Sequence, residues 1–395
     1  FFKSFTYSLT SRAIIMKIST IAVHGGLTDT SHYAAAFPVY LTSTFIQKGP
    51  TEFREYGYSR TANPTRSDVE KHAADIEGAK HGIATATGMA AVSLVFETLN
   101  AGDRVLISNN VYGGTWLYAT ELFKKRGVEF TVVDDFNTYD FETAPADVKL
   151  VYIETPSNPL LEVTDIAHVA KAAKARNWLL AVDNTFLTGV NQRPLDLGAD
   201  VVIYSATKYY GGHSDLLAGL VVLNDDKLYE KLKLYSKALG GVLDPFDCFL
   251  LERGIKTLPL RLARHEENTH AIARYLSAHP GVEAVFYPGL ESDPGYAVNR
   301  RQSKGAGGVL SFRFNEEAYD LEKFVKALKL FQFAVSLGSV ESLISIPATM
   351  THESYAPELQ KKLGITPNLI RVAVGIEDIE DLIADFEQAF AAAKR

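Results

Sequence analysis

The sequence predicts an α/β protein in which a parallel sheet is covered by helices on both faces, followed by a smaller α+β domain. Three observations predict it. Short apolar, β-branched runs alternate with amphipathic helical segments through the middle of the chain. The runs are almost continuously apolar, which is typical of strands buried on both faces of a sheet. From residue 258 onward the pattern changes to longer helical segments mixed with strands, which indicates a second domain.

The alternation of strand and helix starts near residue 82. Strands are expected at 82–87, 104–108, 129–135, 149–155, 179–185, 200–208 and 219–224. Helices are expected between several of these strands, at 88–99, 116–127 and 165–177. Polar residues follow the strands each time, and the ligands of such sheets bind outside the carboxyl ends of the strands. The candidate site is therefore expected at this edge of the sheet.

The last third of the chain predicts mixed structure. A long amphipathic helix is expected at 258–279, strands at 307–314 and 331–337, a helix at 317–330 and a closing helix at 376–395. The predicted division is an N-terminal arm at 16–60, a large domain at 61–257 and a C-terminal domain at 258–395. Residues 1–15 lack acidic side chains and are interpreted as a tag or an upstream extension before Met16.

Composition excludes several classes of protein. The 395 residues carry a net charge of −7 without a basic block, so nucleic-acid binding is not expected. No apolar run approaches the length of a membrane helix. Cys248 is the single cysteine, which rules out an internal disulfide and favours a reducing compartment such as the cytoplasm. No Cys/His spacing indicates a metal site, because His265 and His270 are five residues apart rather than four.

Several familiar α/β chemistries lack their sequence motifs. A nicotinamide site needs GxGxxG between a strand and a helix, and the nearest segment, 305–310, ends in leucine and leads into a strand. Neither a GxxxxGK[ST] loop nor a GxSxG elbow occurs. Dehydrogenase, nucleotide triphosphatase and α/β-hydrolase functions are therefore not expected.

Thr87, Gly88 and Met89 stand where a strand ends and a helix begins. Free backbone N–H groups and the positive end of the helix dipole could hold a phosphate there. A glycine in a tight turn would explain the same residues without any ligand. The segment is thus a candidate phosphate site, with a structural alternative.

Asp183 ends a buried apolar strand, where a carboxylate is costly unless it is paired. A protonated ring nitrogen would supply the partner, and capping of the next turn is the alternative. Ser205, Thr207 and Lys208 end another strand. In an extended segment the two hydroxyls share a face and the lysine points the other way, so they could bind a phosphate while the lysine reaches a carbonyl carbon. A solvated lysine just past a strand is the alternative.

Together, these segments describe a site for pyridoxal phosphate (PLP): a phosphate cradle, a counter-ion for the pyridinium nitrogen and a lysine that can form a Schiff base. Seven segments also occur in the order of one known family: 58–65, 111–115, 154–159, 182–185, 205–215, 336–343 and 369–378. On these motifs the chain resembles the Cys/Met-metabolism family of PLP-dependent enzymes from about Thr20 to Ala392.

The resemblance implies the type I fold of aspartate aminotransferase, the PLP-dependent transferase-like fold. Its large domain has a mostly parallel seven-stranded sheet, and its smaller C-terminal domain is α+β. It also implies a homotetramer made of two catalytic dimers. In such an assembly, Tyr58 and Arg60 of the N-terminal arm would reach the phosphate of a neighbouring subunit's cofactor.

The resemblance assigns roles to the other candidate residues. Lys208 would bond covalently to the cofactor and later carry protons, Asp183 would hold the pyridinium nitrogen, and Tyr112 would stack on the ring and act as an acid/base partner. Gly88, Met89, Ser205 and Thr207 would bind the phosphate. Asn158, Ser336 and Arg371 would bind the substrate, with Arg371 clamping its carboxylate.

The implied activity is a C–S lyase of sulfur amino-acid metabolism. Elimination at the γ-carbon of cystathionine, homocysteine or methionine, giving a 2-oxo acid and ammonia, is favoured. The alternatives are cystathionine γ-synthase, an O-acylhomoserine sulfhydrylase and cystathionine β-lyase. Two positions differ between branches of the family: Val335 stands where many cystathionine-handling members have Glu, and Gly114 where methionine γ-lyases usually have Cys. These two departures favour different branches.

Overall fold

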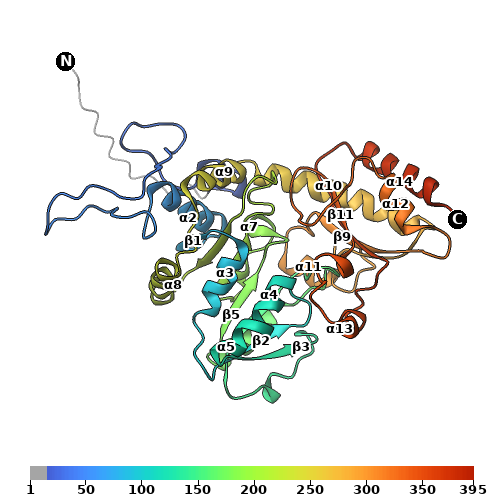
Figure 1. Ribbon diagram of the computed structural model, residues 1–395, viewed down its shortest axis with the longest axis horizontal. Helices are drawn as coiled ribbons and strands as arrows, with labels where there is room; N and C mark the ends of the chain where they lie inside the picture. The colour runs from blue at the N-terminus through green and yellow to red at the C-terminus, as the bar shows by residue number, and fades with distance from the viewer. Residues whose placement is uncertain (1–15) are drawn as a thin grey trace.

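The computed structural model describes residues 16–395 and contains two sheets, one of seven strands and one of five. The seven-stranded sheet is built from strands between residues 81 and 223, and the five-stranded sheet from strands between residues 282 and 373 (Figure 1). The α/β class and the smaller α+β part that the sequence predicts are confirmed. The predicted domain boundaries stay predictions.

The large sheet has the strand order β1-β7-β6-β5-β4-β2-β3. Its strands are β1 (His81–Thr85), β2 (Arg104–Ser108), β3 (Glu129–Val133), β4 (Val148–Glu154), β5 (Leu179–Asp183), β6 (Val201–Ser205) and β7 (Gly219–Leu223). β2 to β6 pair in parallel, whereas β7 is antiparallel to both β6 and β1. The mostly parallel seven-stranded sheet that the resemblance implies is therefore confirmed, and the parallel pairing expected for the strand at 219–224 is wrong. Residues 206–218 form turns and no crossover helix, and without a crossover the chain returns antiparallel.

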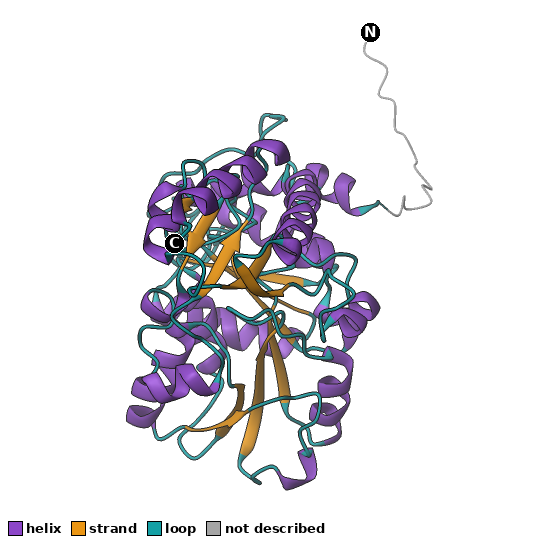
Figure 2. Cartoon of the chain, turned by 90° about the vertical axis from the view of Figure 1, so that its right-hand side faces the viewer, coloured by secondary structure: helices purple, strands orange, loops and turns teal. Residues whose placement is uncertain are grey.

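Both faces of this sheet are buried, as alternate residues of β6 show. Val202 and Tyr204 pack into one apolar cluster, and Val201 and Ile203 into another on the opposite face. Helices cover both faces (Figure 2). The helices of this part are α1 (Ile18–His24), α2 (Pro64–Glu77), α3 (Gly88–Phe96), α4 (Gly113–Leu117), η1 (Tyr118–Phe123), α5 (Lys124–Arg126), η2 (Phe141–Thr143), α6 (Ile166–Ala175), α7 (Thr188–Asn191), η3 (Pro194–Leu197), α8 (Asp226–Leu239) and α9 (Pro245–Ile255).

The small sheet has the order β10-β11-β12-β9-β8. Its strands are β8 (Val282–Phe286), β9 (Val309–Phe314), β10 (Gln332–Phe333), β11 (Leu343–Ser345) and β12 (Leu369–Ala373), and its helices are α10 (Leu258–Ala278), α11 (Tyr296–Gln302), α12 (Leu321–Ala327), η4 (Pro347–Thr349), α13 (Pro357–Lys362) and α14 (Ile379–Ala393). One face packs on α14 through aromatic contacts such as Phe312 with Phe386 and Phe314 with Phe390.

Three predicted elements differ from the structure. The strand expected at 331–337 is reduced to β10, because the chain turns away at Ser336, where φ is +91°. The helix expected at 317–330 is limited to α12, since Asp320 caps its start by accepting a hydrogen bond from the Lys323 N–H. The helix expected at 116–127 contains a π-helical segment, η1. Among residues 16–395, no helix has the length and apolar character needed to span a membrane.

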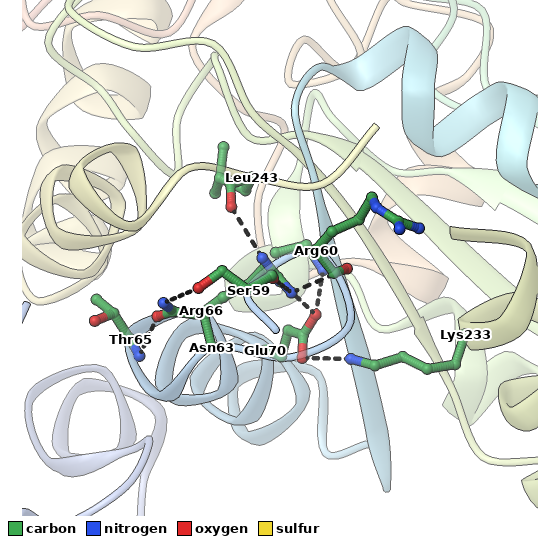
Figure 3. A network of polar contacts seen from close by, with 9 residues as sticks. Ser59, Arg60, Asn63, Thr65, Arg66, Glu70, Lys233 and Leu243 are labelled. Carbon is green, nitrogen blue, oxygen red and sulfur yellow. Dashed lines mark hydrogen bonds and ion pairs between the residues drawn. The ribbon is translucent and has the colours of Figure 1, made fainter. Parts of the chain in front are cut away.

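The segment before α2 extends away from the body of the molecule in long loops (Figure 1). Arg66 of α2 holds the end of this segment in place: its guanidinium donates to the carbonyl oxygens of Ser59 and Leu243 and lies 3.7 Å from the Glu70 carboxylate (Figure 3). Lys233 completes the network by an ion pair with Glu70 at 2.8 Å. Tyr58 and Arg60 are thereby fixed beside α2.

Candidate active site

A cavity of about 610 Å³ opens at the carboxyl ends of β4, β5 and β6, the edge at which the sequence predicts a site. Its walls come from both halves of the chain. β5 of the large sheet supplies Asp183, the turn after β6 supplies Lys208, and the small domain supplies Ser336 and Arg371. This volume is typical of a site for a small molecule.

One end of the cavity is the start of α3. Thr87 caps the helix by accepting a hydrogen bond from the Ala90 N–H at 3.0 Å, so the Gly88 and Met89 N–H groups remain directed outward. Gly88 lies so close to β6 that a Cβ there would stand 2.7 Å from Ser205 Cβ and Oγ. The start of α3 and the Ser205 hydroxyl thus form one narrow, donor-rich corner that suits a phosphate.

Lys208 lies at the bottom of this cavity in the turn after β6. The structure corrects one reason given for its placement: β6 ends at Ser205, so the alternation of an extended segment does not apply to Thr207 or Lys208. All three side chains line the same cavity. Removal from water, and secondly the Arg371 charge, lower the pKa of Lys208 to about 8, although Asp183 opposes the shift.

The sequence leaves two roles open for Asp183, capping of the next turn and pairing with a ring nitrogen, and the position of its side chain suits both. Its Oδ1 accepts hydrogen bonds from the Thr185 N–H at 3.0 Å and the Thr185 hydroxyl at 2.6 Å, which caps the turn. Its Oδ2 accepts from the Tyr152 hydroxyl at 3.4 Å, and the carboxylate lines the cavity. Removal from water raises the pKa of Asp183, and these hydrogen bonds lower it.

Arg371 comes from the middle strand of the small sheet, β12, and is buried. Its Nη1 donates to Asn158 Oδ1 at 3.0 Å, and its Nη2 donates to the Ser336 carbonyl oxygen at 2.7 Å. Its Nε has no partner among residues 16–395. Burial lowers the pKa of Arg371 to about 10, so the guanidinium keeps its charge at neutral pH and is held ready for an anion.

Tyr112 stands at the mouth of the cavity with 47% of its surface exposed. Its backbone N–H donates to both carboxyl oxygens of Glu154, at 3.0 and 2.9 Å. Gly114 leaves room for the ring, because a Cβ there would lie 2.7 Å from Tyr112 Cε1 and 2.9 Å from Met89 Sδ.

Tyr58 and Arg60 do not reach the cavity of their own chain. The Arg60 guanidinium donates to the Lys237 carbonyl oxygen at 2.6 Å and lies 5.5 Å from the centre of the Tyr58 ring. The other predicted site residues all line the cavity: Gly88, Met89, Tyr112, Asn158, Asp183, Ser205, Thr207, Lys208, Ser336 and Arg371.

Comparison with known proteins identifies the family. The family described as "Cys/Met metabolism PLP-dependent enzyme" matches residues 19–391. The chain belongs to this Cys/Met-metabolism family of PLP-dependent enzymes. It is 46% identical over 376 residues to a cystathionine gamma-lyase of Bacillus subtilis, covering 95% of this chain and 99% of that one.

Other members of the Cys/Met-metabolism family are almost equally similar. A cystathionine beta-lyase of Lactococcus lactis subsp. cremoris is 44% identical over 94% of this chain and 98% of its own length. The crystal structure of a cystathionine gamma synthase from Xanthomonas oryzae in complex with cystathionine superposes with a TM-score of 0.93, at 42% identity over 95% of this chain and 98% of that one. The type I fold implied by the motifs is thereby confirmed.

The residues present fit the cofactor of this family. The corner at Gly88 and Ser205 offers donors to a phosphate, Lys208 offers an amine with a lowered pKa, and Asp183 offers a carboxylate to a ring nitrogen. The unpartnered Nε of Arg371 leaves a donor for a carboxylate. A Cys/Met-metabolism enzyme needs these groups for PLP and an amino acid.

Sequence reasoning missed Glu154, Tyr152 and Thr185. Glu154 ends β4 as Asp183 ends β5, so the argument applied to Asp183, a carboxylate at the end of a buried strand, also applies to Glu154. The segment 350–355 was missed too; it packs over α4, where the Tyr355 hydroxyl donates to the Val111 carbonyl oxygen at 3.0 Å. No local pattern in that segment points to the site.

Proposed function

We propose that the protein is a PLP-dependent C–S lyase that eliminates a thiol from cystathionine, homocysteine or methionine, preferentially at the γ-carbon. The observation that carries this proposal is the convergence of Lys208, Asp183 and Arg371 on one cavity that begins at the start of α3. Relatives named as lyases of cystathionine, at 46% and 44% identity, support the choice of reaction.

Each residue of the cavity has a role in this proposal. Gly88, Met89, Ser205 and Thr207 bind the phosphate, and Asp183 keeps the ring nitrogen protonated. Bound PLP supplies an electron-accepting ring conjugated to the substrate amine. Arg371, oriented by Asn158 and the Ser336 carbonyl oxygen, binds the substrate carboxylate and thereby fixes the Cα–H bond.

Lys208 and Tyr112 move protons in this proposal. The Lys208 amine takes the proton from Cα, for which a pKa of about 8 leaves a useful neutral fraction at neutral pH. The Tyr112 hydroxyl, at the mouth of the cavity, protonates the leaving sulfur. Val335 is 53% exposed and lines the same mouth, so an apolar side chain meets the distal part of the substrate.

The test is to offer cystathionine, methionine and an O-acylhomoserine with cysteine, and to compare kcat/KM. Formation of 2-oxobutyrate and ammonia from a thioether supports γ-elimination, and Lys208→Ala serves as the inactive control. Pyruvate from cystathionine would indicate the β-lyase instead. Accumulation of cystathionine from the acylated substrate, without 2-oxo acid from any thioether, would contradict the lyase proposal.

A γ-replacing transferase is the second candidate. It is supported by the TM-score of 0.93 to a cystathionine gamma synthase, which shows that this fold also occurs in a transferase. Cystathionine γ-synthase and O-acylhomoserine sulfhydrylase differ from the lyase in letting a thiol add back. The same assay separates them, because only the transferases consume the acylated substrate and the thiol together.

We further propose a homotetramer, located in the cytoplasm, in which Tyr58 and Arg60 complete the phosphate site of a neighbouring subunit. Their position outside the cavity of their own chain supports this assembly. The arm also exposes large apolar side chains to solvent, namely Tyr33, Leu41, Ile46 and Phe53, which are 70–88% exposed. Several large apolar side chains exposed on one segment are consistent with a protein interface there.

A further inference from the structure

Glu154 and Asp183 form a pair of carboxyl groups at the end of two neighbouring strands. β4 and β5 are parallel, and Glu154 stands directly opposite Asp183 in the register. Residues opposite one another in a sheet project from the same face, and like charges in that position repel. Glu154 is 7% exposed, so water screens this repulsion poorly.

Glu154 has no cationic partner within the part of the chain that the structure describes. Among residues 16–395, none of the ion pairs includes Glu154, and the titratable groups that face it are Asp183, Tyr152 and Tyr355. Both carboxyl groups accept hydrogen bonds, Glu154 from the Tyr112 N–H and Asp183 from Thr185, but of the two only Asp183 also faces the Lys208 ammonium group. If the Glu154–Asp183 pair holds one proton, that proton is therefore expected on Glu154.

The Tyr152 hydroxyl connects the two groups. Its oxygen lies 3.2 Å from Glu154 Oε1 and 3.4 Å from Asp183 Oδ2. A hydroxyl has one hydrogen to donate, so two carboxylates would compete for it. If Tyr152 donates to Asp183, its oxygen can accept a hydrogen bond from a protonated Glu154. The Tyr152 hydroxyl then makes a hydrogen bond with each of the two carboxyl groups without competition between them.

Glu154 also fixes the position of Tyr112. The Tyr112 N–H donates to both Glu154 oxygens, at 3.0 and 2.9 Å, at the point where α4 begins. The Thr115 hydroxyl of the same helix lies against the Glu154 carboxyl group. Glu154 thus contacts the segment that carries the proposed acid, and the Tyr152 hydroxyl connects it to the carboxylate proposed for the ring nitrogen.

We propose that Glu154 is a positioning residue that stays a neutral carboxylic acid, so that the Glu154–Asp183 pair holds a single negative charge while Glu154 anchors Tyr112. This inference rests on the proposed function for the role of Asp183 and Tyr112. Burial, and secondly the Asp183 charge, raise the pKa of Glu154, which agrees with this assignment.

The first test is infrared difference spectroscopy of the purified protein between pH 6.5 and 9.5, with and without PLP. Burial also raises the pKa of Glu77 to about 8, so Glu77 contributes a protonated-carboxyl band of its own. Wild type should show a second component of this band that Glu154→Gln removes and Glu77→Gln leaves in place.

Glu162→Gln is the control, because Glu162 is a second carboxyl group of the same region that Asn110 and Ser157 contact through hydrogen bonds and that has no contact with Tyr112. That control should keep the band. A protonated-carboxyl band of unchanged intensity in Glu154→Gln would overturn the proposal.

The second test needs no variant. Neutron diffraction of the wild-type holoenzyme should place a deuteron on the Glu154 carboxyl group and none on Asp183. A deuteron-free Glu154 would overturn the proposal. Failure of the proposed function would appear separately, as the absence of 2-oxo acid from every thioether in the assay of the wild-type enzyme.

The anchoring role predicts a specific kinetic change. Glu154→Asp keeps the acid but withdraws it by one methylene, so Tyr112 should lose its position and kcat should fall by up to about 100-fold. KM should change little, because Arg371 still binds the substrate carboxylate. A rise in KM with unchanged kcat would contradict the anchoring role, and Glu154→Gln should restore the position of Tyr112.

Discussion

Lys208 is a cation placed where a cation is costly. Its pKa falls to about 8 because the turn after β6 removes it from water and because Arg371 adds a second positive charge nearby. The same cost prepares the amine for chemistry, since a lysine with its ordinary pKa would be almost entirely protonated at neutral pH. At the scale of single residues, Lys208 thus lowers the free energy of unfolding at the position where the chemistry is proposed.

We expect Lys208→Met to stabilise the cofactor-free protein at pH 7 by about 1–3 kcal/mol. The folded-state pKa of Lys208, about 8, lies below its unfolded value, so the unfolded chain binds the extra proton between about pH 8 and 10.4. The loss of folding stability caused by Lys208 is therefore complete below pH 8 and disappears as the pH rises through this window. Urea unfolding at pH 7 and pH 10 measures it. An equal gain at both pH values would contradict the explanation.

Arg371→Lys should raise KM for the amino-acid substrate by about 10- to 150-fold, which corresponds to about 1.5–3 kcal/mol for a charge-assisted hydrogen bond. Lysine keeps the charge but cannot contact Asn158, the Ser336 carbonyl oxygen and a carboxylate in one plane. Steady-state kinetics measure KM. An unchanged KM would show that the substrate carboxylate binds elsewhere.

At the scale of elements, the start of α3 and the end of β6 depend on one close contact. Gly88 permits this contact, because any Cβ would stand 2.7 Å from Ser205. The two elements are far apart in sequence, and their contact forms the corner proposed for the phosphate.

Gly88→Ala should therefore weaken PLP binding by at least about 10-fold and destabilise the fold by about 1–3 kcal/mol, as overpacking usually does. Titration followed by absorbance measures the affinity, and urea unfolding measures the stability. Gly49→Ala is the matched control, since nothing lies within 4 Å of a Cβ at that position. Normal PLP affinity in Gly88→Ala would argue against a phosphate at this corner.

At the scale of the whole molecule, the cavity needs both sheets and, in our proposal, a second chain. The large sheet supplies the lysine and the carboxylates, and β12 of the small sheet supplies Arg371. Tyr58 and Arg60 lie outside the cavity of their own chain, and we propose that they serve the phosphate site of another subunit.

The double variant Ile46→Asp/Phe53→Asp tests this assembly. Both side chains are exposed in the single chain, at 88% and 72%, so the charges should leave an isolated subunit folded. We expect a smaller species in sedimentation velocity and weaker PLP binding, because charges at an interface lose solvation. A tetramer with normal PLP affinity would contradict the role proposed for the arm.

The sequence by itself determined the strand-and-helix order, the chemistry of the strand ends and the family, because apolar runs, turn residues and motifs are local properties of the chain. Lys208 and Asp183 could be singled out in this way. Only the tertiary structure decided that β7 runs antiparallel, that the strand expected at 331–337 bends at Ser336, and that Glu154 faces Asp183 across two strands. Register and contact between distant segments depend on how the elements pack, and no single segment encodes them.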